Sequence, residues 1–224
     1  MDGLSQIETE LGKVFEWNLT AINNAIKPAK VNALWQDIAI RYNETQRAYH
    51  SLQHIQQLFV QFEQIKHHLN EPHIIALALY YHDIIYDPRR SDNELKSAEY
   101  IVEALRCYLS DEQCTTIYTL IMMTASHELH ECLDTDTVSD AAYLLDMDLS
   151  ILGTPWSEYQ VYAQAVRQEY RHITNEDYRT GRIAVLKKLL AHPVLYLTAY
   201  YHNYFEVQAR DNIKREISLL HASQ

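Results

Sequence analysis

The chain has 224 residues, a formal net charge of -11, and only four glycines and five prolines. The glycines nowhere cluster into a phosphate-binding loop, so the common glycine-rich nucleotide-binding folds have no support. The acidic balance disfavours binding to nucleic acid or to anionic membranes, because both require a basic protein surface.

Apolar residues recur at the helical repeat along almost the whole chain, beginning with Leu4, Ile7 and Leu11. The pattern predicts helices over residues 4–19, 30–44, 51–69, 72–86, 92–109, 112–129, 138–150, 155–173, 176–191 and 195–220. Capping boxes are expected at Ser91–Glu94 and Ser110–Gln113, and Thr154 is expected to cap a helix that starts with Pro155. No segment shows the alternation of a half-buried strand, so the fold is predicted to be all-α.

The organisation of the chain is expected to be simple. No linker rich in proline, glycine or serine divides it, which predicts a single domain over residues 1–224. Its N-terminal segment lacks the basic and apolar regions of a signal peptide, and no apolar run reaches membrane-spanning length. The three cysteines form neither a CxxC pair nor a disulfide framework. We therefore expect a cytoplasmic protein with reduced thiols.

Two fragments suggest a metal site. His50 and His54 are four residues apart, so they share one helix face if a helix begins near Tyr49. Both could bind one metal, or one could bind metal while the other serves as an acid. His82 and Asp83 close an apolar run that reads as a buried helix, and burying such a pair is costly unless a cation compensates it.

The order of these motifs is similar to that of a known family. The motifs are Tyr49-His50-x-x-x-His54, His82-Asp83-x-x-Tyr86-Asp87-Pro88, Asp92-Asn93-Glu94-x-x-Ser97-Ala98, Asp148-Leu149-Ser150-Ile151-Leu152-Gly153 and Glu206-x-x-x-Arg210-x-Asn212. Together they resemble the HD superfamily of metal-dependent phosphohydrolases, and more narrowly a bacterial group of predicted HD phosphohydrolases. The resemblance spans most of the chain. It implies an HD-type helical bundle with the metal site between central helices, a motif core over residues 45–153 and a C-terminal helical extension over residues 154–224.

The resemblance also implies roles for individual residues. The metal ligands would be His54, His82, Asp83 and Asp148, with Asp83 also counted among the catalytic residues. His50 would protonate the leaving group, as the first histidine does in the similar Tyr-His-Asn stretch of class I cyclic-nucleotide phosphodiesterases. In this chain Ser51 stands where those enzymes have asparagine.

Four further residues are considered for the site. Asp146 and Asp148 lie two apart on a predicted helix and point to nearly opposite sides, so only one should reach the metal. Some HD enzymes hold a second metal with additional histidines, a role open to His127 or His130. Exposed histidines near a helix end are an equally good interpretation of these two. Arg47, one turn before His50, could bind substrate phosphate.

The expected activity is hydrolysis of a phosphate ester or anhydride in a small phosphorylated molecule, with a nucleotide among the candidates. One or two divalent ions per chain, chosen from Mn, Mg, Fe, Co, Ni and Zn, would activate the attacking water. Two alternatives stay open: an HD-like di-iron oxygenase, and a metal-dependent module that binds a nucleotide without turnover. Neither nucleic acid nor a membrane is an expected partner.

Overall fold

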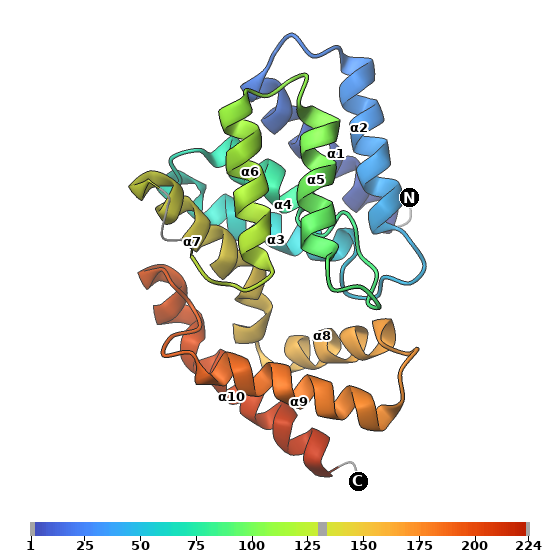
Figure 1. Cartoon of the computed structure of the whole chain (residues 1–224), viewed down its shortest axis with the longest axis vertical. Coiled ribbons are helices and arrows are strands. Elements are labelled where there is room, and N and C mark those ends of the chain that lie inside the picture. Colours follow the sequence, from blue (N-terminus) through green and yellow to red (C-terminus); the bar gives the residue numbers. More distant parts are fainter. Residues whose placement is uncertain (1–2, 130–133, 223–224) are drawn as a thin grey trace. The chain divides into compact units, whose positions relative to one another are not determined.

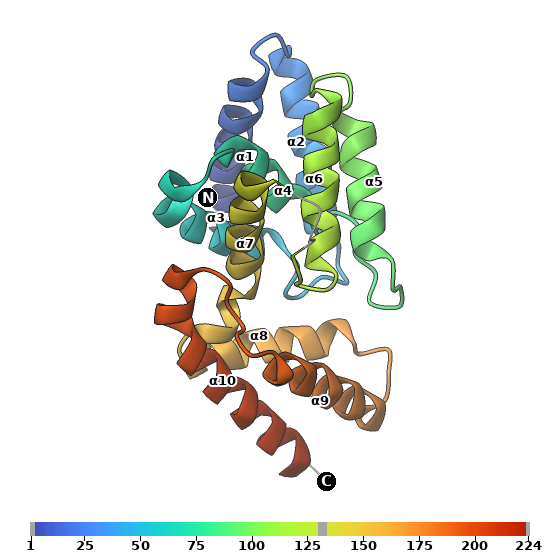
Figure 2. The same cartoon turned by 60° about the vertical axis from the view of Figure 1, so that its left-hand side comes forward.

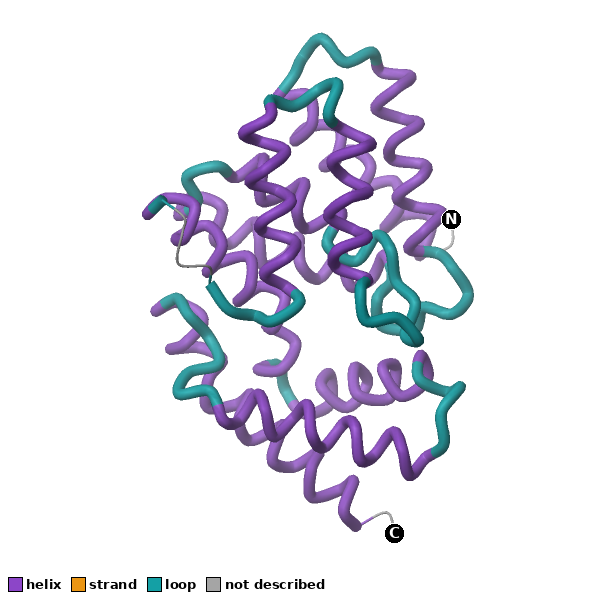
Figure 3. The backbone as a smooth tube through the Cα atoms, in the orientation of Figure 1, coloured by secondary structure: helices purple, strands orange, loops and turns teal. Residues whose placement is uncertain are grey.

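The computed structural model describes residues 3–129 and 134–222, and every regular element in these ranges is a helix (Figure 1, Figure 3). The prediction of an all-α fold is therefore confirmed. The α-helices are α1 (Gly3–Ile22), α2 (Pro28–Tyr42), α3 (Leu52–Ile65), α4 (Pro72–Tyr81), α5 (Asn93–Leu105), α6 (Asp111–Thr124), α7 (Thr135–Leu149), α8 (Trp156–Glu169), α9 (Asn175–Ala191) and α10 (Ala199–Ala222). Two short 3-10 helices, η1 (Lys66–His68) and η2 (Ser150–Gly153), follow α3 and α7.

The chain divides into two compact units, one up to Leu144 and one from Leu145 onward. The division falls inside α7, which begins in the first unit and ends in the second. No helix in the described ranges is long and apolar enough to cross a lipid bilayer. His130 and Cys132, one of the three cysteines, lie outside the described residues.

Helix α4 lies at the centre of the first unit. Its residues from Ile74 to Tyr81 are all buried, and a helix that is apolar on every side must be enclosed by other elements. It packs against α1, α3, α5 and α6, and α5 and α6 lie side by side in both views (Figure 1, Figure 2). His82 directly follows the last residue of this enclosed helix and is therefore buried as well.

The predicted helix over residues 72–86 is too long, because α4 ends at Tyr81. The chain turns after His82, and side chains of α5 take over its backbone hydrogen bonds. The Ser97 hydroxyl accepts from the Ile85 amide at 3.1 Å, and the Asn93 side chain accepts from the Asp87 amide and donates to its carbonyl. These partners compete with continuation of the helix.

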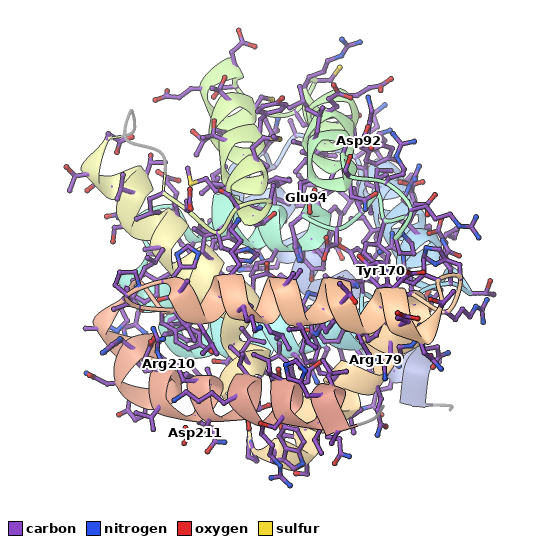
Figure 4. The ribbon with its side chains drawn as sticks, turned by 60° about the horizontal axis from the view of Figure 1, so that its bottom comes forward. Asp92, Glu94, Tyr170, Arg179, Arg210 and Asp211 are labelled. Atoms are coloured by element: carbon purple, nitrogen blue, oxygen red, sulfur yellow. The ribbon has the colours of Figure 1, made fainter. Side chains whose placement is uncertain are left out.

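The second unit consists of the end of α7, η2 and helices α8 to α10, with α10 packed against both η2 and α9. Figure 4 shows α9 and α10 running side by side, with Arg210 on α10. The Arg210 guanidinium donates to the Leu190, His192 and Pro193 carbonyls at the end of α9. The expected helix over residues 195–220 starts only at Ala199, because carboxylates bind the amides of residues 195–198.

Candidate metal centre

Two buried histidines meet at the end of α4. His54 lies in the first turn of α3, and His82 follows the last residue of α4. Each is only 2% exposed, and their Nε2 atoms are 3.3 Å apart. The pairing depends on the packing of α3 against α4, which brings together two motifs separated by 28 residues.

The orientation of His82 is fixed by the helix that precedes it. Its Nδ1 lies 2.9 Å from the Leu79 carbonyl oxygen, and a carbonyl can only accept, so Nδ1 carries a hydrogen. In the neutral ring, Nε2 therefore presents a lone pair toward His54. A proton on His54 or a shared cation can satisfy that lone pair. The backbone bond on the opposite ring nitrogen is the usual arrangement of histidines that bind metals.

A carboxylate completes the group. His54, His82 and Asp148 each offer one ligand atom, and these atoms lie within 4.8 Å of one another. Asp148 belongs to the last turn of α7. Among the described residues, this is the group of histidine and acidic side chains that could hold a metal ion. Two imidazole nitrogens and one carboxylate oxygen fit a divalent cation, so the cofactor expectation is supported to this extent.

Asp83 lies beside this group without belonging to it. Its Oδ2 is 3.1 Å from His82 Nε2 and 3.9 Å from His50 Nε2. The Asp83 carboxylate is thus close enough to influence both rings. Its assignment as a metal ligand stays a prediction.

His50 is placed differently from the sequence prediction. Helix α3 begins at Leu52, so His50 lies in the turn before it and not on the same helix face as His54. The two rings are still near each other, with centroids 5.9 Å apart, and Tyr49 contacts both. His50 also stacks on Tyr86 at 4.2 Å, with 29° between the ring planes, and its side chain is 20% exposed. The ring is therefore held in place while part of it stays accessible to solvent.

The Arg47 side chain does not point to solvent. It is fully buried, at 0% exposure. Its guanidinium donates to the backbone carbonyls of His50, Asp83 and Ile84 at 3.1, 2.8 and 2.9 Å. Direct clamping of a substrate phosphate by Arg47 is inconsistent with this geometry, because backbone acceptors already occupy the guanidinium.

The two aspartates of α7 have separate partners. Asp148 joins the histidines, whereas the buried carboxylate of Asp146 accepts from the backbone amides of Leu197 and Thr198 and from the Thr198 hydroxyl, at 2.7 to 2.8 Å. Burial raises the pKa of Asp146 to about 6 despite these hydrogen bonds. Of the two aspartates, Asp148 belongs to the group that could hold a metal ion, and its role as a ligand stays a prediction.

His127 is outside the three-residue group. It follows α6 with a φ of 55°, in the left-handed region, and its amide donates to the Met123 carbonyl at 2.8 Å. This is the hydrogen bond of a helix C-terminus, where glycine is the usual residue. The second-metal role of His127 stays a prediction.

Sequence reasoning assigned no role to Tyr86 or to the Leu79 carbonyl, although both orient histidines of the site. Tyr86 belongs to the quoted Tyr86-Asp87-Pro88 motif, which was the available signal for it. A backbone carbonyl leaves no signal in a sequence. Comparison of the chain with family models, curated proteins and solved structures gave no match. The HD resemblance therefore rests on the motif residues.

Proposed function

We propose that the protein is a metal-dependent phosphohydrolase that acts on a small phosphorylated molecule. The observation that carries this proposal is the buried His54–His82 pair, with facing Nε2 atoms and the Asp148 carboxylate close by. Two buried imidazoles and a half-buried carboxylate that lie this close together form a donor set suited to a divalent cation. A bound divalent ion compensates all three groups at once.

The donor set suits several metals. Imidazole nitrogen with carboxylate oxygen favours Mn, Fe, Co, Ni or Zn, while Mg requires additional water ligands. Such an ion supplies Lewis acidity, which activates water and polarises phosphoryl oxygens. The net charge of -11 makes a large polyanion an unsuitable substrate, whereas one small phosphate group can be neutralised locally.

The role of His50 in this proposal is to donate a proton to the leaving oxygen. Its ring is partly exposed, so a substrate can reach it, and stacking on Tyr86 restricts its rotation. The Asp83 carboxylate lies 3.9 Å from its Nε2, so an acidic side chain is close to the ring that would deliver the proton. Asp83 is thus close to both His50 and His82.

The test is a phosphate-release assay without oxygen. Purified protein is incubated with nucleotides, sugar phosphates and aryl phosphates in the presence of Mn, Mg, Co or Ni, beside His82→Ala and the control His67→Ala, which changes an exposed histidine of η1. The proposal expects metal-dependent release of phosphate or of the dephosphorylated product by wild type and His67→Ala only. Oxygen consumption without phosphate release would favour the oxygenase, and nucleotide binding without release would favour the binding module.

A further inference from the structure

The buried guanidinium of Arg47 connects two segments that carry the histidines of the site. One is the loop between α2 and α3, which contains His50. The other is the turn after α4, which contains His82 and Asp83. Arg47 Nη1 donates to the carbonyls of His50 and Asp83, and Nη2 donates to the carbonyl of Ile84. One side chain thus bonds to backbone on both segments, which lie 36 residues apart in the sequence.

These carbonyls need an external donor. Neither segment is helical, so their backbone groups lack the regular partners that a helix provides. The planar guanidinium carries five N–H donors in a fixed fork, which lets it reach several acceptors at once. A lysine has only one nitrogen and cannot reproduce this geometry.

Aromatic rings surround the same guanidinium. Its carbon lies 4.9 Å from the ring centroid of Tyr42 and 5.5 Å from that of Tyr86. Tyr86 is also the ring that stacks on His50. Arg47 therefore supports His50 in two ways, through the His50 carbonyl and through the ring beneath its imidazole.

The electrostatic environment explains how a full charge is tolerated there. Arg47 Nε lies 3.3 Å from a carboxylate oxygen of Glu44, whose side chain is partly exposed, and its Nη atoms donate to backbone carbonyls. A purely electrostatic role would need only one close carboxylate. The three hydrogen bonds to carbonyls indicate that Arg47 fixes the backbone geometry of both segments and does not act through its charge alone.

We infer that Arg47 is a positioning residue. It fixes the loop that contains His50 against the turn that contains His82 and Asp83, and thereby holds the proton donor and the metal ligand at a defined separation. This inference rests on the proposed function, because it takes the two segments that Arg47 joins to be parts of a metal centre. Groups that orient metal ligands typically change metal affinity by roughly 10- to 100-fold when they are replaced.

The experiment combines two measurements on the full chain. Hydrogen–deuterium exchange reports the opening of residues 47–52 and 82–87, and a Mn²⁺ titration reports the affinity of the site. The variants are Arg47→Lys and Arg47→Met. The matched control is Arg41→Lys, since Arg41 also pairs with an acid, Asp37, and lies over a tyrosine ring, but its side chain is 28% exposed and belongs to the last turn of α2.

The inference expects faster exchange in both segments and Mn²⁺ affinity weaker by roughly 10- to 100-fold in the Arg47 variants, with Arg41→Lys close to wild type. Unchanged exchange in Arg47→Lys would disprove the connection between the segments. Faster exchange with unchanged Mn²⁺ affinity would disprove the positioning role, as would loss of the entire helical circular dichroism signal. Failure of the wild type to bind any metal would instead refute the proposed function, and the exchange arm would still decide whether Arg47 joins the segments.

Discussion

Two aspartates in the last turn of α7 show how neighbouring residues of the same type acquire different tasks. The side chain of Asp146 satisfies the amides of Leu197 and Thr198, whereas Asp148 lies with His54 and His82. Spacing on the helix predicted this separation, because positions two apart face different sides. It did not reveal the partners of Asp146, which lie about fifty residues later in the chain.

Replacement of these aspartates should therefore separate stability from metal binding. Asp146→Ala leaves two amides and a hydroxyl without their acceptor, and we expect it to lower the free energy of unfolding by about 1–3 kcal/mol while metal affinity is retained. Asp148→Ala should lower the metal affinity while the free energy of unfolding changes little. Urea denaturation and metal titration of both variants measure the two effects. Equal losses of metal affinity would contradict the separate roles.

His50 and His54 should also differ when they are replaced. His54→Ala removes a nitrogen of the metal group and should lose bound metal. His50→Ala should keep metal but lose turnover, and the loss should be smaller for substrates with good leaving groups, which need no proton. Metal analysis and rates on phosphate esters of graded leaving-group acidity provide the test. Loss of metal from His50→Ala would make His50 a ligand and leave the acid unidentified.

At the scale of the elements, the sequence predicted the existence of helices better than their ends. The apolar run of α4 is sufficient to identify a buried helix. Its end after Tyr81 depends on Arg47, Asn93 and Ser97, which bind the following turn from elsewhere in the chain. The start of α10 likewise depends on the carboxylates of Asp146 and Glu206. Such long-range hydrogen bonds override local periodicity and cannot be found in a sequence window.

The helix caps give a direct comparison. At Ser110 the predicted capping box is present, since its hydroxyl accepts from the Gln113 amide and the Gln113 side chain accepts from the Ser110 amide. At Ser91 the prediction is wrong, because α5 is preceded by Asp92. The prediction at Thr154 is also wrong, because α8 begins at Trp156 and is preceded by Pro155.

These caps predict unequal effects of the same substitution. Ser110→Ala should destabilise the protein by about 1 kcal/mol, because it removes the acceptor for the Gln113 amide. Ser91→Ala should change stability by less than about 0.5 kcal/mol, as is usual for a surface substitution. Chemical denaturation of the two variants in parallel measures both changes in the free energy of unfolding. Equal destabilisation would show that the cap at Ser110 contributes nothing of its own.

At the scale of the whole molecule, the sequence predicted an all-α protein, and the structure confirms it. The absence of a linker did not reveal that the chain packs as two compact units, because the division lies within the continuous helix α7. A helix that continues through such a division carries no change in composition. The ordered motifs include His54, His82 and Asp148, which form the group that could hold a metal ion. The carbonyl network of Arg47 has no signal in the sequence, because its acceptors are backbone groups.

We propose above all that His54, His82 and Asp148 hold a divalent cation. The most direct test of this proposal is the metal content of protein purified after supply of Mn, Co, Zn and Fe, measured by elemental mass spectrometry on wild type, His82→Ala and His67→Ala. We expect about one or two ions per chain in wild type and His67→Ala, and almost none in His82→Ala with its helical circular dichroism signal preserved. Metal-free wild type, or equal metal content in His82→Ala, would contradict the proposal.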